Sequence, residues 1–187
     1  YLKLLFARVG KTYSPVSGEL VKRHKVSDVL EMLLKREEGQ RFLVSAPIDI
    51  PKGRNYYDQL KILQQQGYTR VGLNNIVEQI SDTLKIKGLE KQKQVHLIID
   101  RLKVQKTHEF EGRLSDSVQT AFYESKGICH IHELTKDDVI VHEFSNKFEL
   151  DGISFEEPSL NLFTFNNPYG ACKKCDGFGT VIGIDPD

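Results

Sequence analysis

Two cysteines near the end of the chain have a spacing that suggests metal binding. Cys172 and Cys175 are separated by two residues, and Gly177 and Gly179 follow them. A C-x-x-C turn places two thiolates on one side of a tight loop, where they can share a tetrahedral metal ion. Glycines allow the backbone to fold closely around such a turn. A structural zinc ion takes four ligands, so the pair is either half of a site or two free thiols.

Histidines form a weaker candidate site. His130 and His132 are two positions apart on an expected strand, and His142 falls on the next expected strand. Histidines on one face of a sheet can hold a metal ion, but exposed polar positions on a half-buried strand are the commoner case. Cys129 reads as a small core residue. Since no nucleophile–base or acid–base arrangement is visible, we assign no catalytic residue.

Two arginines are the better candidates for binding a partner. Arg70 and Arg101 each lie on or beside a short apolar strand. A guanidinium group can present a rigid planar fork to a carboxylate of another protein. The alternative is that each is an ordinary surface arginine.

The composition is that of a globular protein, and the charge is unevenly distributed. Of 187 residues, 39% are hydrophobic and 28% charged, with a formal net charge of zero, so the totals neither favour nor exclude nucleic acid. Residues 83–106 are rich in lysine, whereas residues 107–160 carry twelve acids against four bases. Local fields of opposite sign suit a surface that docks a charged partner; a solvated surface of mixed charge is the alternative.

Cysteine content and hydropathy indicate the compartment. Three cysteines with one close pair do not make a disulfide framework, so a reducing compartment, the cytoplasm, is expected. No apolar run approaches the ~18 residues of a membrane span. The chain starts without Met and reads as a piece of a longer protein.

The residue patterns predict an α+β fold, with a mixed or antiparallel sheet and about three helices on it. Apolar stripes indicate helices at 1–9, 27–39, 55–67 and from 115 onward, the last three capped by Ser27, Asn55 and Ser115. Strands are expected at 41–48, 68–73, 83–87, 94–104, 128–134 and 139–144. After Phe144 a loop-rich segment follows that carries the C-x-x-C turn, and we expect aromatic side chains to anchor it.

Several sequence strings together resemble the UvrA family, the damage-recognition ATPases of bacterial nucleotide excision repair. These strings are Tyr1-Leu-Lys-Leu-Leu-Phe-Ala-Arg-Val-Gly10, Gly67-Tyr-Thr-Arg-Val71, Ile99-Asp-Arg-Leu102, Arg113-Leu-Ser-Asp-Ser-Val-Gln-Thr-Ala121 and Leu162-Phe-Thr-Phe-Asn-Asn-Pro-Tyr-Gly-Ala-Cys-Lys-Lys-Cys-Asp-Gly-Phe-Gly179. The resemblance covers essentially the whole chain, and the last string is the most specific.

The resemblance implies a division of the chain and a set of partners. Residues 1–10 and 146–187 would belong to the ATPase signature region, and 11–145 to the inserted domain that binds UvrB. Arg70 and Arg101 lie where UvrA proteins present arginines to UvrB. A full-length family member would bind ATP and zinc, dimerise and survey damaged DNA. This piece lacks the phosphate-binding loop, so we expect no ATP hydrolysis from it and no cofactor.

Two departures from the family pattern bear on zinc. Ser14-Pro-Val-Ser17 stands where the family often has a cysteine-rich turn, and serine hydroxyls are poor zinc ligands beside thiolates. Glu149-Leu-Asp-Gly152 stands where a second C-x-x-C pair is expected. Glu149 and Asp151 could complete a mixed site with Cys172 and Cys175, but that ligand set is uncommon. We therefore expect an incomplete site with low zinc occupancy.

Three other readings remain. The string Cys172-Lys-Lys-Cys-Asp-Gly-Phe-Gly179 matches one unit of the chaperone zinc-ribbon repeat, but such domains need several copies. A stand-alone α/β enzyme would need a catalytic pair that is not visible. A direct DNA-binding module would use the lysines of 85–106, although no aromatic residue interleaves them to stack on bases.

Overall fold

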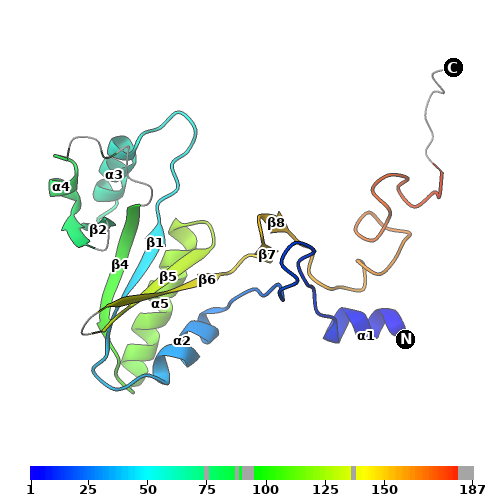
Figure 1. Cartoon of the computed structure of the whole chain (residues 1–187), viewed down its shortest axis with the longest axis horizontal. Coiled ribbons are helices and arrows are strands. Elements are labelled where there is room, and N and C mark those ends of the chain that lie inside the picture. Colours follow the sequence, from blue (N-terminus) through cyan, green and yellow to red (C-terminus); the bar gives the residue numbers. More distant parts are fainter. Residues whose placement is uncertain (74–75, 87–88, 90–94, 136–137, 181–187) are drawn as a thin grey trace. The chain divides into compact units, whose positions relative to one another are not determined.

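In this computed structural model, the described part of the chain divides into two units. The structure describes residues 1–73, 76–86, 89, 95–135 and 138–180. One unit runs from His24 to Lys147, and the other combines Tyr1–Arg23 with the chain from Phe148 onward. Figure 1 traces the chain and labels its elements. No helix in the described part of the chain is long and apolar enough to cross a membrane.

A six-stranded antiparallel sheet forms the unit from His24 to Lys147. Its strands are β1 (Arg41–Pro47), β2 (Arg70–Leu73), β3 (Ile76–Gln79), β4 (Val95–Lys103), β5 (Ile128–Leu134) and β6 (Val139–Ser145). They lie in the order β3-β2-β4-β1-β5-β6, and every pair is antiparallel. The predicted α+β class is confirmed, with the antiparallel form of the sheet.

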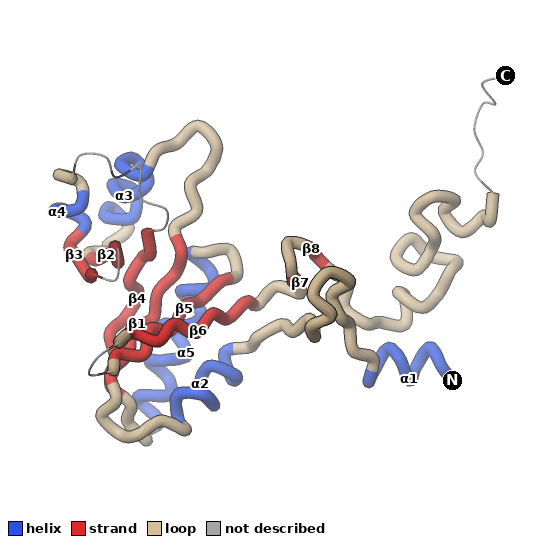
Figure 2. The backbone as a smooth tube through the Cα atoms, in the orientation of Figure 1, coloured by secondary structure: helices blue, strands red, loops and turns tan. Residues whose placement is uncertain are grey.

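Four helices belong to this sheet unit: α2 (Val26–Leu34), α3 (Tyr56–Gln65), α4 (Ile80–Thr83) and α5 (His108–Glu124). The long helix α5 packs on β1, β4 and β5 and on α2, while α4 packs on β2, β3 and α3; Figure 2 shows the helices in blue against the red strands. Helix and strand side chains meet in one apolar core, which includes Leu33, Phe42, Leu60, Leu97, Leu114 and Ile131. Burial of this apolar surface is the main stabilising contribution to the fold.

The strand registers assign side chains to two faces of the sheet. Phe42, Val44 and Ala46 of β1 belong to the apolar core, so their face is called the core face. Leu43 and Ser45 alternate with them and lie on the opposite face, called here the outer face. Residues paired across neighbouring strands share a face, and Ser45 pairs with His130 of β5. The outer face therefore carries polar and ionisable side chains.

An irregularity in β4 changes which of its residues point outward. Val44 pairs with Asp100 but Ser45 pairs with Ile98, so Ile99 is an extra residue in β4. Such a β-bulge shifts the alternation by one position. As a result Asp100 shares the core face with Val44, whereas Arg101 lies on the outer face. Strict alternation from Leu97 would have placed Arg101 on the core face.

Three details of the expected elements are wrong. The helix expected to be capped by Ser27 begins at Val26, with Lys25 as its N-cap residue and Asp28 accepting from the Lys25 backbone amide. The third helix begins at His108 behind Thr107, not at Ser115. Its first seven residues, 108–114, are mostly polar and concealed the first turns.

The strand expected at 83–87 is also not formed as predicted. Residues 76–79 form β3, and Ile80–Thr83 form the short helix α4. Ile80 and Thr83 are fully buried, because a single helical turn directs both side chains into the core. The sequence also predicts a turn at Asn74-Asn75, but these two residues, like the lysines at 91 and 93, lie outside the described residues.

The second unit is rich in loops and has few buried side chains. It contains α1 (Leu2–Val9), β7 (Glu149–Leu150) and β8 (Ile153–Ser154). None of the residues of α1 is buried, although its apolar stripe is present as expected. The loop-rich C-terminal segment is confirmed, but its aromatic anchors are only partly so. Phe6 and Phe163 contact each other with tilted rings, their centroids 5.9 Å apart, while Phe165 and Tyr169 are largely exposed.

Candidate interaction surface

A hollow at the edge of the sheet brings the two predicted arginines together. It has a volume of about 260 Å³, and its lining includes Tyr68, Arg70, Ile98, Asp100, Arg101 and Arg113. The hollow exists because β2 pairs only with Val95–Leu97 of β4. Beyond Leu97, the edge of β4 that faces away from β1 has no neighbouring strand among the described residues. Arg70 at the start of β2 and Arg101 on β4 thus stand on either side of a gap in the sheet.

Asp100 is the one acid in the lining of this hollow, and it is engaged by an arginine of α5. Arg113 donates two hydrogen bonds to its carboxylate, from Nε at 2.8 Å and from Nη2 at 2.7 Å. The Ser117 hydroxyl donates a third at 3.1 Å, and the Arg101 backbone amide a fourth at 2.7 Å. Burial alone raises the pKa of Asp100, but these hydrogen bonds outweigh it and leave the pKa below its usual value.

The positive charge of Arg113 balances the negative charge of Asp100, so Arg70 and Arg101 leave the hollow with a net positive charge. Arg70 and Arg101 are both exposed, and no carboxylate of the described residues forms an ion pair with either side chain, the nearby acid being paired with Arg113. Tyr68 adds no charge, since burial and a hydrogen bond to Glu124 raise the pKa of its hydroxyl to about 12. The geometry suits a ligand that brings carboxylates.

A second hollow continues the same surface. It has a volume of about 310 Å³ and is lined by Arg101, Lys103, Gln105, Glu109, Phe110 and Arg113. Arg101 and Arg113 therefore border both hollows. The name arginine surface is used below for Arg70, Arg101 and Arg113 with the two hollows between them. The role of Arg113 was not foreseen, because its partner Asp100 turns toward α5 only through the bulge.

Cys172 and Cys175 lie in a hydrogen-bonded turn of the loop-rich unit. The Cys172 carbonyl accepts from the backbone amides of Cys175 at 3.2 Å and Asp176 at 2.7 Å. Backbone amides of Lys174 and Cys175 and the Cys175 thiol lower the pKa of the Cys172 thiol. In the part of the chain that the structure describes, no third histidine, cysteine or acid joins these two sulfurs in a ligand cluster.

Asp151, one of the two acids that could have completed such a site, is used elsewhere. Its carboxylate accepts hydrogen bonds from the hydroxyls of Ser14 and Ser17, the latter at 2.6 Å, and from the Ser17 backbone amide at 3.2 Å. These bonds lower the pKa of Asp151. Two thiols without further ligands do not fit a structural zinc ion, and low zinc occupancy at Cys172 and Cys175 stays a prediction.

The histidines combine in a different set from the one expected. His130 and His132 lie near His96 of β4, whereas His142 pairs with Glu133 at 3.1 Å. His142 stands opposite Ile131 on the core face, so it cannot join the other two. His96 was missed because β1 separates β4 from β5 in the sheet, and no spacing in the sequence reveals that proximity.

Comparison with known protein families identifies the kind of domain that the sheet unit forms. Residues 25–135 match the family model of the UvrA interaction domain, which corresponds to most of the sheet unit. The whole chain is 31% identical over 191 residues to the UvrABC system protein A of Methanothermobacter thermautotrophicus, and 33% identical over 193 residues to that of Mycobacterium tuberculosis. For the protein of Clostridium tetani the identity is 35% over 193 residues, covering 99% of this chain.

The chain belongs to the UvrA family. It spans about a fifth of the length of these relatives, since the matches cover 20%, 20% and 19% of them. What lies in the remaining four fifths of a relative is therefore not represented in these 187 residues.

Proposed function

We propose that this chain is the UvrB-binding portion of a UvrA protein and that the arginine surface is where UvrB docks. The observation that carries the proposal is the convergence of Arg70 and Arg101 on one hollow whose own acid, Asp100, is already paired with Arg113. Two guanidinium groups without an internal counter-ion among the described residues are available to carboxylates of a partner. The match to an interaction domain of the UvrABC system supports a protein as that partner.

In the parent protein this docking would serve nucleotide excision repair. The resemblance implies that the full-length protein binds and hydrolyses ATP, forms a homodimer, surveys DNA for damage and brings UvrB to it. No G-x-x-x-x-G-K-[ST] phosphate-binding loop occurs in the 187 residues, because Leu5 stands where Gly10-Lys11-Thr12 would require the first glycine. We expect the chain alone to have no ATPase activity above background.

The pairing with UvrB should depend on charge and on the shape of the guanidinium group. An arginine that becomes desolvated against a carboxylate contributes on the order of 2 kcal/mol or more, which is about a 30-fold change in Kd, and far less at an exposed rim. Lysine keeps the charge but cannot form the two parallel hydrogen bonds. Arg101→Lys should therefore bind UvrB less tightly than the native chain and more tightly than Arg101→Ala.

Titration of labelled UvrB with this chain tests the proposal. Arg70→Ala and Arg101→Ala should each raise Kd, by about 30-fold for a desolvated contact. Arg54→Ala is the matched control, because Arg54 is an exposed arginine of the same unit whose side chain donates to Gln59 and lies away from both hollows. If both test variants bind UvrB as tightly as the control, the arginine surface is not the docking site.

Direct binding of DNA is the alternative function, and the basic lining of the second hollow is the observation that favours it. Arg101, Lys103 and Arg113 border that hollow, and phosphates would be attracted by the same charges. Titration of the chain with duplex DNA in the absence of UvrB separates the two functions. Strongly salt-dependent DNA binding that Arg101→Ala weakens, together with no capture of UvrB, would favour the alternative.

A further inference from the structure

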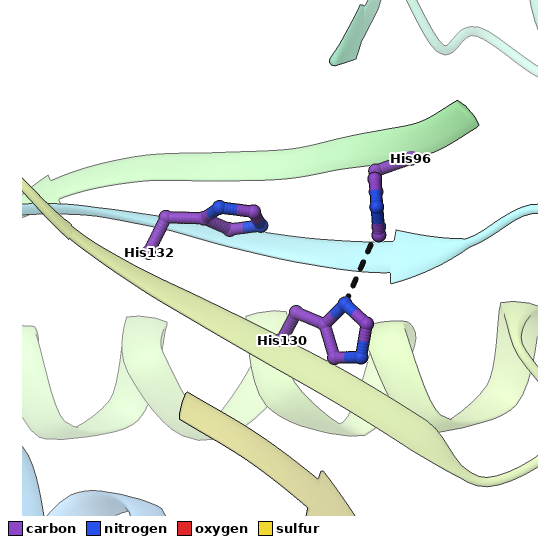
Figure 3. Close-up of side chains that lie close together, drawn as sticks. All are labelled: His96, His130 and His132. Carbon is purple, nitrogen blue, oxygen red and sulfur yellow. Dashed lines mark hydrogen bonds between the residues drawn. The ribbon is translucent and has the colours of Figure 1, made fainter. Parts of the chain in front are cut away.

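Three histidines gather on the outer face of the sheet. His96 comes from β4, and His130 and His132 come from β5. One potential ligand atom from each lies within 4.8 Å of the other two. Figure 3 shows His96 and His132 over β1, the strand that runs between β4 and β5, and His130 nearer to β5, with His96 directed toward His130. Because each strand pairs with β1 in a fixed register, the backbone itself brings the three side chains together.

The separation between two of the rings matches the geometry of a metal site. Nδ1 of His96 and Nδ1 of His130 are 3.3 Å apart. In a tetrahedral zinc site with Zn–N distances of about 2.0–2.1 Å, neighbouring ligand nitrogens are about 3.3–3.4 Å apart. A hydrogen bond between the two rings would have a similar length, so the third histidine and the surrounding groups decide between the two interpretations.

The hydrogen bond on the far side of His130 directs a lone pair into the cluster. Its Nε2 lies 3.0 Å from a carboxylate oxygen of Glu143. Since a carboxylate accepts hydrogen bonds, the tautomer that fits this contact carries its proton on Nε2, and the lone pair of that tautomer is on Nδ1, which faces His96. A carboxylate behind a histidine in this way is the usual outer-shell support of a metal-binding imidazole.

The other two histidines are also prepared to act as ligands. The Ser45 hydroxyl lies 2.7 Å from Nε2 of His132 and holds its ring in place. Nδ1 of His96 faces Nδ1 of His130 at 3.3 Å, so both of these nitrogens point into the cluster.

His96 and His132 are only partly buried, so solvent reaches one side of the cluster. Among the described residues, no fourth histidine, cysteine or acid completes the set.

We propose that His96, His130 and His132 bind one divalent transition-metal ion, with Zn²⁺ as the expected ion and a fourth position open to water. Three imidazole ligands with an open position are a set that zinc accepts. The ion would link β4 to β5 across β1 and so stabilise the folded sheet, because a ligand that binds only the folded state stabilises it. The site is independent of UvrB docking, and neither proposal requires the other.

The binding test uses the untagged chain with the two cysteines of the C-x-x-C turn replaced, Cys172→Ser and Cys175→Ser, so that this turn cannot contribute. Cys129 does not interfere, because burial raises its pKa to about 12. Equilibrium dialysis against Zn²⁺ with metal analysis should give one ion per chain, and Co²⁺ should give the visible absorption of a tetrahedral site with nitrogen ligands. If this reference protein binds no zinc and shows no such absorption, the proposal is wrong, whatever the histidine variants do.

Variants of the reference protein assign the ligands. His96→Gln should lose the bound ion, and the matched control His108→Gln should keep it, because His108 is a fully exposed histidine at the start of α5. Glu143→Gln should weaken zinc binding about 10- to 100-fold as an outer-shell change. Zinc should raise the melting temperature of the reference and of His108→Gln but not of His96→Gln, and circular dichroism without metal checks that each variant is folded. Equal zinc affinity in His96→Gln and His108→Gln would overturn the assignment.

Discussion

Replacement of Arg113 by alanine tests the central electrostatic arrangement of the arginine surface. The change removes the two hydrogen bonds of 2.8 and 2.7 Å to Asp100. Hydrogen bonds to charged groups contribute about 1.5–3 kcal/mol each. The Arg113 side chain is 62% exposed and that of Asp100 is 18% exposed, so solvent screening reduces the sum. We expect Arg113→Ala to lower the free energy of unfolding by about 1–2 kcal/mol at pH 7.

The pH dependence of this difference follows from the pKa of Asp100. Hydrogen bonding by Arg113 is the largest of the effects that hold the pKa below its usual value. A depressed carboxyl pKa contributes stability above the pKa of the unfolded chain, and the contribution is lost as the pH falls through the folded pKa. In Arg113→Ala the pKa of Asp100 rises. The stability difference between the native chain and the variant should therefore shrink below about pH 4. It should vanish when Asp100 is protonated in both proteins.

Urea denaturation at several pH values measures this prediction. A double-mutant cycle with Asp100→Asn isolates the Asp100–Arg113 interaction from other effects of each change. Arg54→Ala serves as the control for loss of an exposed arginine. A coupling free energy near zero at pH 7, or a stability difference that stays constant from pH 7 to pH 3, would refute the view that Arg113 neutralises Asp100.

Two further predictions concern α5 and the C-terminal loop. Thr107→Ala should lower the free energy of unfolding by about 1 kcal/mol, because the Thr107 hydroxyl oxygen caps α5 by accepting from the Phe110 amide. Ser115→Ala, inside the helix, should change it by less than about 0.5 kcal/mol. Equal effects of the two changes in urea denaturation would contradict the assigned start of α5. Gly170→Ala should loosen the loop around Cys172, because a Cβ at position 170 would lie 2.3–2.7 Å from three backbone carbonyl oxygens. Gly112→Ala is the control, since a Cβ there meets nothing within 4 Å, and faster proteolysis of the loop in both variants, or in neither, would contradict the reasoning.

Much of the sheet unit could be predicted from local patterns. The strand predicted at 41–48, with a buried middle, and the continuous apolar run of β4 could be placed from the sequence, because short apolar runs of this kind are typical of buried strands. In β1 the residues from Phe42 to Ala46 are indeed all buried. Asn55 was identified as an N-cap, and its side chain accepts from the Asp58 amide at 2.8 Å. The start of α5 was placed too late, because the residues between Thr107 and Leu114 are mostly polar and show no clear stripe.

The sequence by itself determined the family, the α+β class and Arg70 and Arg101 as candidate residues. These properties depend on residue identity and on spacing along the chain, which are visible without coordinates. The C-x-x-C pair and the absence of further cysteines beside it were equally plain.

Only the tertiary structure decided which side chains meet. The bulge at Ile99 turns Arg101 outward and Asp100 toward Arg113, and a shift of one residue in register leaves little trace in composition. His96 reaches His130 across β1 because the order of strands in the sheet differs from their order in the chain. Long-range strand pairing brings together residues that are 34 positions apart, and no local pattern encodes that proximity.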